Sequence, residues 1–242
     1  MTRLFLDTVV QQERVIHLTG EKAHYLSMVL RCKIHDALIV TDSSGKTYSA
    51  EISSITRKET TLEIKAPIDH NNESPLDIIL AQGLLKGEKM DLVIQKATEL
   101  GAKEIRPMIT ERSQIRETRK LQRWQKIAGE ASRQCGRNLI PLIHEPEAFE
   151  TVIASEGFHQ GIICWEKEGA PFSAALEPFT GEKRLVLCIG PEGGFSENEI
   201  RTAEDRGLTV ASLGKRILRA ETAAIAALAI LQYSIGDIGA VR

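Results

Sequence analysis

The sequence predicts an α/β protein in which a small β-rich module precedes a larger domain of alternating strands and helices. Short strand-like runs separated by turns fill residues 37–66. From Leu76 onward, apolar runs alternate with segments of helical periodicity. Towards the carboxyl end, residues 190–194 and 213–216 each form a glycine-containing loop between a strand-like run and a helix. α/β proteins form ligand sites from such loops at the carboxyl ends of their strands.

In the first module, a short helix precedes a β meander whose turns contain serine, glycine and charged residues. The expected helix covers 21–30, and the expected strands cover 37–42, 47–55 and 60–66. A β-rich module of this size favours a compact barrel. Residues 69–75 are polar and turn-rich, so we place the linker there. The expected domains are residues 1–72 and 73–242.

In the second domain, strands and helices alternate. The expected strands cover 77–82, 103–109, 160–165, 184–189 and 209–213, and the first two helices cover 90–100 and 118–135. Gly101 closes the first of these helices, because glycine is common just past a helix end. The spacing alone predicts an ordinary open parallel sheet without a knot.

Two further helices follow the two glycine loops. Ser196 is a good N-cap, and Glu199 three residues later completes a capping box. Gly207 supplies the stop of that helix. The last helix, over residues 221–231, is almost wholly apolar, so we expect it to be buried on most sides.

The loop at residues 190–194 could bind a ligand through its backbone. Gly193 and Gly194 let the chain come close to a ligand, and the following helix offers unpaired N–H groups at its start. The carboxylate of Glu192 would repel a phosphate, so a neutral or cationic nucleoside is favoured. The alternative is a glycine-rich turn that only joins strand to helix.

Composition argues against several classes of protein. The formal net charge is -2, so any basic surface for nucleic acid must be local. Residues 223–231 form the longest apolar run, which is too short to span a bilayer, and the amino-terminal residues lack the apolar core of a signal peptide. The cysteines and histidines show no metal-ligand spacing, and neither Ser196 nor any cysteine lies in a nucleophile motif. We expect a soluble cytoplasmic protein with no membrane or metal partner and no covalent catalysis.

Three long motifs occur in order along the chain. They are KGEKMDLVIQKATELGAKEIRPMITERS, IGPEGGFSENEI and LGKRILRAETAAIAAL, at residues 86–113, 189–200 and 213–228. Together they resemble the SPOUT class of RNA methyltransferases, and most closely its RsmE family, which methylates N3 of a uridine in 16S ribosomal RNA of the small subunit. The resemblance covers nearly the whole chain.

The resemblance implies a fold, a cofactor and partners. The fold is a PUA-like β-barrel domain that binds RNA, followed by a SPOUT domain with a deep trefoil knot, in which the last helix threads under an earlier loop. The cofactor is S-adenosyl-L-methionine. The partners are the 30S subunit or its ribosomal RNA and a second copy of the chain, with each pocket near the interface of the homodimer.

The family pattern also assigns residues to the cofactor. They are Ile189, Gly190, Pro191, Glu192, Gly193, Gly194, Leu213, Gly214, Ile217, Leu218 and Ala223. Ile217 and Leu218 would be apolar walls of the pocket, although ordinary core packing would select the same residue types.

Methyl transfer to N3 of uracil requires that N3 lose a proton, so a base or an anion-stabilising cation is needed. Arg219 and Glu221 lie between the second loop and its helix. We expect Arg219 to orient or stabilise the uridine anion, and Glu221 to orient Arg219 or accept the proton. The alternative for Glu221 is a carboxylate that only stabilises the start of a helix.

Contacts with RNA phosphates require local basic surface, and residues 111–140 are rich in arginine and lysine. The residues expected to contact RNA are Arg3, Arg14, Lys22, Arg31, Arg112, Arg116, Arg123 and Arg133. The alternative is a solvated helix face.

Two other functions fit the sequence less well. One is a non-catalytic RNA-binding or ribosome assembly factor, against which the intact loop motifs argue. The other is a SPOUT methyltransferase acting on another RNA, such as transfer RNA. The β-rich first module and the motif at 86–113 favour the ribosomal family over it.

Overall fold

The computed structural model describes residues 2–10, 14–69, 71–155, 160–179, 181 and 184–239. The chain forms two compact units. The first comprises Met1–Asn72 and Arg133–Leu139, and the second comprises Glu73–Ser132 and Ile140–Arg242. The main division falls in the expected linker, of which residue 70 lies outside the described residues.

The first unit contains a five-stranded sheet and a short helical segment. Its strands are β1 (Thr2–Phe5), β2 (Val15–Thr19), β3 (Ala37–Thr41), β4 (Thr47–Ile55) and β5 (Glu59–Ile68), in the order β1-β3-β4-β5-β2. β1 is parallel to β3, and the other pairs are antiparallel. The described strands form an open path from β1 to β2, so the sheet is a half-barrel, less closed than the compact barrel expected.

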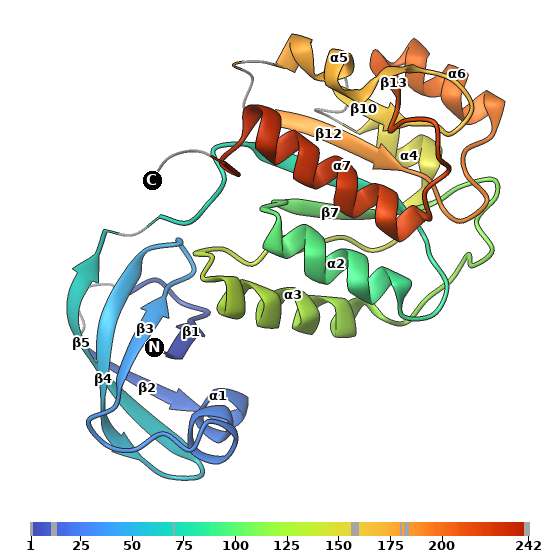
Figure 1. Cartoon of the computed structure of the whole chain (residues 1–242). Helices are drawn as coiled ribbons and strands as arrows, with labels where there is room; N and C mark the ends of the chain where they lie inside the picture. Colours follow the sequence, from blue (N-terminus) through green and yellow to red (C-terminus); the bar gives the residue numbers. More distant parts are fainter. Residues whose placement is uncertain are drawn as a thin grey trace. The chain divides into compact units, whose positions relative to one another are not determined.

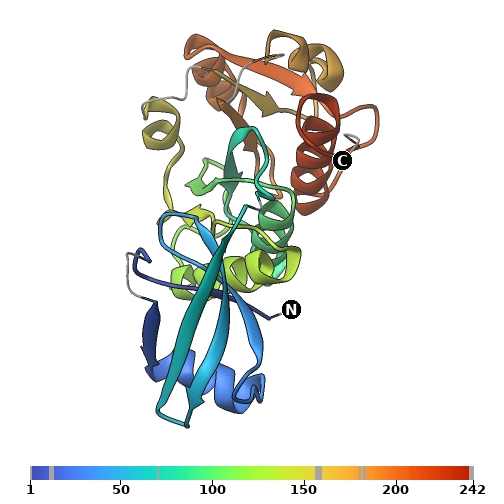
Figure 2. The same ribbon diagram turned by 90° about the vertical axis from the view of Figure 1, so that its left-hand side faces the viewer.

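The expected meander is confirmed by β3, β4 and β5, whereas β1 and β2 were not expected. The expected helix is present as α1 (Gly20–His24), which continues as a π-helical turn over Tyr25–Val29. Figure 2 shows the long β4–β5 pair, in which the register shifts twice. Such bulges increase the twist of a strand pair and bend it, here around a core that includes Leu38, Ile52 and Leu62.

The second unit is a parallel sheet with helices on both faces (Figure 1). Its strands are β6 (Asp77–Gly83), β7 (Glu104–Ile109), β8 (Leu142–Ile143), β9 (Glu147–Ala148), β10 (Gly161–Cys164), β11 (Ala170–Pro171), β12 (Arg184–Ile189) and β13 (Leu208–Ser212). Its helices are α2 (Lys89–Glu99), α3 (Leu121–Cys135, of which the part from Arg133 on belongs to the first unit), α4 (Phe149–Ala154), α5 (Phe172–Leu176, followed by a 3-10 turn over Glu177–Phe179), α6 (Glu197–Asp205) and α7 (Ala220–Ile235). All strands and helices expected for this unit are confirmed. The short elements β8, β9, β11, α4 and α5 were not expected.

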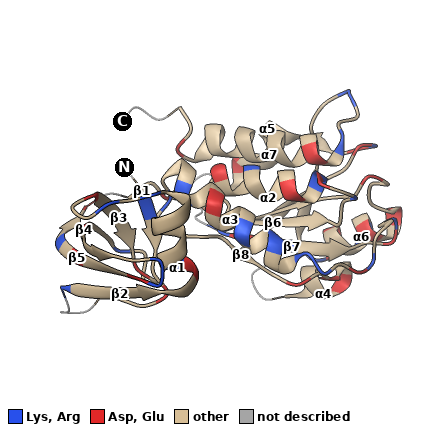
Figure 3. Cartoon of the chain, turned by 90° about the horizontal axis from the view of Figure 1, so that it is seen from below, with Lys and Arg blue, Asp and Glu red and all other residues tan. Residues whose placement is uncertain are grey.

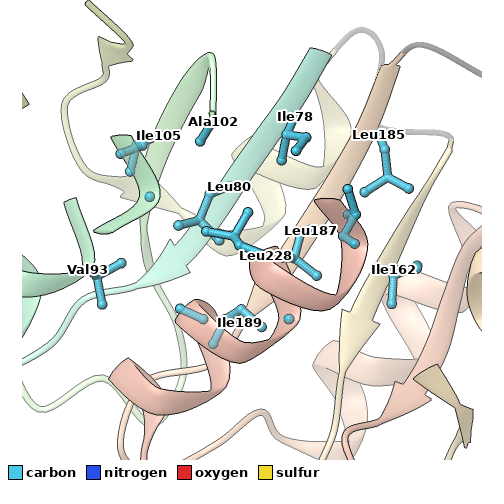
Figure 4. Close-up of a cluster of buried hydrophobic side chains, with 14 of the residues drawn as sticks. Ile78, Leu80, Val93, Ala102, Ile105, Ile162, Leu185, Leu187, Ile189 and Leu228 are labelled. Carbon is cyan, nitrogen blue, oxygen red and sulfur yellow. The ribbon is translucent and has the colours of Figure 1, made fainter. Parts of the chain in front are cut away.

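The central strands are buried on both faces. Ile78 and Leu80 of β6 pack on the side of α2 and α7, together with Leu228, as Figure 4 shows. Ile79 and Ala81, the intervening residues, pack on the side of α4 and α6. Since side chains of a strand alternate between faces, a continuous apolar run is what a strand covered on both sides requires.

The order of the strands shows how the chain is threaded. The sheet runs β11-β13-β10-β12-β6-β7-β8, so β13 lies between β10 and β11. Those two strands are consecutive in the chain and are joined by residues 165–169 only. This connection crosses β13 at Ala211, where the Trp165 amide donates to the Ala211 carbonyl at 2.9 Å. The loop 165–169 therefore passes over β13, the strand that precedes the last helix, as the expected threading of that helix requires. The knot itself stays a prediction.

The last helix is buried or half-buried over most of the expected span. One face of α7, with Ala224, Leu228 and Leu231, is fully buried. The other face carries Ile230, which is 40% exposed, and Tyr233, which is 73% exposed. Within the expected span 221–231, only Thr222 and Ile230 are exposed, so the expectation of burial on most sides is confirmed, and the exposed apolar surface lies on one face.

Candidate functional site

A cavity of about 680 Å³ lies where β10, β12 and β13 end and α7 begins. Its walls are Lys89, Cys164, Trp165, Glu166, Ile189, Gly190, Pro191, Glu192, Gly193, Gly194, Ser212, Leu213, Gly214, Arg216, Ile217, Leu218, Arg219, Ala220 and Ala223. The carboxyl ends of parallel strands meet at one edge of a sheet, so segments far apart in the sequence come together there.

The first wall is the loop 190–194, which follows β12 and packs directly on the end of β6. A Cβ atom added to Gly83 would lie 2.4 Å from the Pro191 nitrogen, so only glycine allows this approach. Beside it, the buried Gln82 side chain donates to the Gly190 carbonyl at 3.2 Å. The positive φ of 67° at Gly194 turns the chain towards α6.

Glu192 ties the same loop to the start of α2. Its Oε1 accepts from the Lys86 backbone N–H at 3.2 Å and from Lys89 Nζ at 3.0 Å. Burial raises the pKa of Glu192, but the hydrogen bonds, with the charge of Lys89, outweigh burial and hold the pKa below its ordinary value. The carboxylate is therefore ionised at neutral pH.

The other side of the loop is fixed by the segment that follows β7. Arg112 donates to the Gly193 carbonyl at 3.3 Å, and its Cβ lies where a side chain on Gly193 would be. The neighbouring Glu111 N–H donates to Glu199 Oε1 at 2.8 Å. Glu199 also completes the expected capping box with Ser196 at the start of α6, which is confirmed.

The second wall is the connection from β13 to α7. A Cβ atom added to Gly214 would meet no atom within 4 Å, so this part of the wall is open. Ile217 is 81% exposed and Leu218 half-buried, so Ile217 does not pack in a core. Arg219 is the N-cap of α7, and its exposed side chain borders the cavity.

All eleven residues assigned to the cofactor line this one cavity: Ile189, Gly190, Pro191, Glu192, Gly193, Gly194, Leu213, Gly214, Ile217, Leu218 and Ala223. Of the two expected catalytic residues, Arg219 lines it and Glu221 does not. Glu221 lies in the first turn of α7 with 9% of the residue exposed. The structure thus brings together Arg219 and the residues expected to bind the cofactor, whereas Glu221 is not part of the cavity wall.

Sequence reasoning missed other residues of the wall. They are Lys89, Cys164, Trp165, Glu166, Ser212, Arg216 and Ala220. Cys164, Trp165 and Glu166 could have been found from the sequence, because they end or follow β10. A strand was expected at 160–165, and the carboxyl ends of parallel strands meet at the same edge of the sheet. Lys89 stood inside a quoted motif, but its distance of 103 residues from Glu192 hid the contact.

Of the residues expected to contact RNA, some are exposed and others pair with neighbouring side chains. Arg112 and Arg116 are exposed on the loop after β7, and Arg123 on α3 pairs with Asp91 at 2.8 Å. Figure 3 shows basic and acidic residues interspersed over α2 and α3. The expected stripe is therefore interrupted.

In the first unit, Arg14 and Arg31 are exposed and Arg3 is half-buried. Lys22 pairs with Asp7 at 2.6 Å, and the Arg133 guanidinium lies 5.3 Å from the centre of the Tyr25 ring.

Other chemistry at the site is limited. Burial raises the pKa of the Cys164 thiol to about 12, and burial followed by the neighbouring Cys164 raises that of Cys188 further. Both cysteines are therefore protonated at neutral pH and are poor nucleophiles. Among the described residues, no group of three or more histidine, cysteine or acidic side chains could hold a metal ion. No helix in the described part of the chain is long and apolar enough to cross a membrane.

Comparisons with known proteins identify both parts of the chain. Residues 72–232 match the family model for an RNA methyltransferase domain, and residues 18–65 match that for an RNA methyltransferase PUA domain. The chain is 35% identical to the ribosomal RNA small subunit methyltransferase E of Buchnera aphidicola, over 97% of this chain and 94% of that protein. It is 32% identical to the Bacillus subtilis protein of the same name, with 96% of each covered.

Two solved structures resemble the whole chain. The ribosomal RNA small subunit methyltransferase E of Neisseria gonorrhoeae, bound to S-adenosyl methionine, has a TM-score of 0.91 and 31% identity, and 98% of this chain and 99% of that chain are covered. A putative methyltransferase of Legionella pneumophila, in complex with the cofactor SAM, has a TM-score of 0.89 and 35% identity, with 98% of each chain covered.

Proposed function

We infer the function from one premise: this chain belongs to the ribosomal RNA small subunit methyltransferase E family. It is a methyltransferase that uses S-adenosyl-L-methionine and acts on ribosomal RNA of the small subunit. The observation that carries this conclusion is the cavity at the carboxyl ends of β12 and β13, because both loop motifs of the family form its walls.

The residues present fit the cofactor. The cavity volume of about 680 Å³ is within the range of small-molecule sites. Leu213, Leu218 and Ala223 offer apolar walls, and the backbone of 190–194 offers polar groups for the edges of adenine and ribose. When bound, S-adenosyl-L-methionine supplies a methyl group on a positively charged sulfur. The protein contributes mainly position, since an in-line approach of the nucleophile accounts for much of the acceleration.

We propose N3 of a uridine in 16S ribosomal RNA as the acceptor, as the resemblance implies. Loss of the N3 proton leaves negative charge on the uracil ring, and Arg219 is positioned at the cavity wall to stabilise it. Glu221 is behind the wall and in the first turn of α7, where a carboxylate interacts favourably with the helix dipole. We therefore assign Glu221 to the stability of that helix start and not to proton transfer.

Among the residues expected to contact RNA, Arg112 lies beside the cavity and could hold the RNA at the reacting site. Its side chain is exposed and contacts the carbonyl of Gly193, which lines the cavity. A phosphate bound there would position a nucleotide without reading its base. We propose that the substrate is the 30S subunit or its RNA in the cytoplasm, with Arg14 and Arg31 of the first unit adding phosphate contacts.

We further propose a homodimer that uses the outward face of α7. Ile230 and Tyr233 are large and exposed there, and lie three residues apart on one side of the helix. Ala220 and Ala223 of the same helix line the cavity, so a second copy packed along α7 would lie close to the site. A second copy would bury apolar surface that the monomer leaves in water.

The function is tested by transfer of a labelled methyl group from S-adenosyl-L-methionine to small ribosomal subunits that lack their own modification. Nucleoside mass spectrometry then identifies the product. Label recovered as 3-methyluridine is the expected result. No transfer by a protein that binds the cofactor would contradict the proposed substrate, and label in another nucleoside would contradict the proposed acceptor.

A further inference from the structure

Lys89 is a wall residue of the cavity that reaches the cofactor loop through Glu192. It is the first residue of α2, and its Nζ lies 3.0 Å from Glu192 Oε1. The side chains of Lys89 and Glu192 are 38% and 20% exposed, so the pair is partly shielded from water. The Lys86 amide donates to the same oxygen at 3.2 Å. The start of α2 therefore holds Glu192 by two donors on neighbouring turns of the chain.

Glu192 stands in the middle of the loop 190–194, so whatever holds its side chain also holds the backbone on either side. Among the described residues, two other side chains donate hydrogen bonds to the loop. Gln82 reaches the Gly190 carbonyl and Arg112 reaches the Gly193 carbonyl, one at each end. Of these contacts, only the one from Lys89 pairs a positive charge with the negative charge of Glu192 at the centre of the loop. Charge-assisted hydrogen bonds are stronger and shorter than neutral ones.

We propose that Lys89 is a positioning residue for methyl transfer, which acts through Glu192 to hold the loop 190–194 in its binding conformation before the cofactor arrives. A loop already ordered in the free protein loses less conformational entropy on binding. Removal of the Lys89 charge should therefore weaken cofactor binding and leave the rate of methyl transfer by the cofactor-bound protein nearly unchanged. This inference rests on the proposed function only in naming S-adenosyl-L-methionine as the ligand.

The experiment compares Lys89→Met with Lys96→Met in the full-length protein. Lys96 lies on the same helix and pairs with Glu99 at 2.9 Å, but it is not part of the cavity wall. Calorimetry should show S-adenosyl-L-methionine binding weakened about fivefold by Lys89→Met, since partly exposed ion pairs contribute up to about 1 kcal/mol. Lys96→Met should leave it unchanged. kcat at saturating cofactor should change much less than KM, and Lys89→Arg should restore affinity.

A double-mutant cycle tests whether Lys89 acts through Glu192. Glu192→Gln keeps an acceptor for the Lys86 amide and removes the negative charge. If Lys89 works through Glu192, the double variant should bind as weakly as the weaker single variant, because both remove one interaction. Additive losses would mean that Lys89 touches the cofactor itself, and would overturn the proposal.

The pH dependence supplies a second readout. The pKa of Glu192 in the folded protein is depressed. The ion pair between Lys89 and Glu192 is therefore intact above the ordinary pKa and is lost as pH falls through the depressed value. In Lys89→Met, burial still raises the pKa of Glu192, but fewer hydrogen bonds oppose that effect. Cofactor affinity of this variant should therefore fall on acidification at a higher pH than that of the unaltered protein.

A measurement without ligand separates this proposal from the proposed function. Hydrogen exchange of the amides of 192–194 in the free protein should be faster in Lys89→Met and unchanged in Lys96→Met. Equal exchange in both variants, or equal cofactor affinity, would overturn the role of Lys89 and leave the function intact. If the unaltered protein failed to bind S-adenosyl-L-methionine, the function and the inference would fall together.

Discussion

Gly83→Ala should disturb cofactor binding from a residue that is not itself in the cavity wall. A Cβ atom at this position would lie 2.4 Å from the Pro191 nitrogen, about 1 Å inside the 3.4 Å at which ordinary contact begins. Two more atoms of the same turn, Pro191 Cδ and the Gly190 carbonyl carbon, would lie at 2.6 and 2.8 Å. These are backbone and ring atoms, which cannot rotate away, so the loop has to move.

The cost of that movement should appear in three measurements. Overpacking of this kind destabilises a protein by about 1–3 kcal/mol. A displacement of about 1 Å at a reacting site can also lower catalytic efficiency by about a hundredfold. We therefore expect Gly83→Ala to lower the free energy of unfolding, to weaken S-adenosyl-L-methionine binding, and to reduce kcat/KM for methyl transfer well beyond what partial unfolding explains.

Gly161→Ala is the matched control. A Cβ atom there would lie 2.5 Å from the Val186 carbonyl oxygen, a clash of similar size in the same sheet. Gly161 begins β10, whereas the cavity lies where β10 ends. This variant should lose similar stability and keep its affinity for the cofactor. If Gly83→Ala and Gly161→Ala bind S-adenosyl-L-methionine equally well at a temperature where both are folded, β6 does not hold the loop and the reasoning is refuted.

Three other predictions concern single contacts. Arg219→Ala should slow methyl transfer about a hundredfold while cofactor affinity stays within about twofold, and Arg219→Lys should recover part of the rate; equal losses of rate and affinity would exclude a role for Arg219 at the acceptor. Ser196→Ala should lower the free energy of unfolding by about 1 kcal/mol in urea titrations, because the α6 capping box is lost; an unchanged midpoint would show that the box contributes no stability. Ile230→Lys combined with Tyr233→Lys should yield monomers in sedimentation experiments, whereas Gln125→Lys on the exposed face of α3 should not; an unaltered protein that is itself monomeric at micromolar concentration would contradict the dimer.

Local patterns in the sequence were sufficient for most elements of the second unit. The capping box of Ser196 and Glu199 lies within one helical turn, so its residues determine the start of α6 without help from the rest of the chain. The strands β6 and β12 are continuous apolar runs, a pattern that identifies a strand covered on both faces. By contrast, β1 and β2 contain only four and five residues and depend on pairing with distant strands, so no local signal marked them.

The sequence alone, through the resemblance of its two loop motifs to a known family, was enough to assign eleven residues that line one cavity. The α/β pattern explains why they lie together, since loops that follow parallel strands must meet at one edge of the sheet. Only the tertiary structure decided what surrounds those loops. It placed Arg219 at the cavity and Glu221 behind the wall, two residues away. It joined Lys89 to Glu192 and left one apolar face of α7 in water. Such contacts depend on how distant elements pack. The residues of one element can show that a face is covered, but not which distant residue covers it.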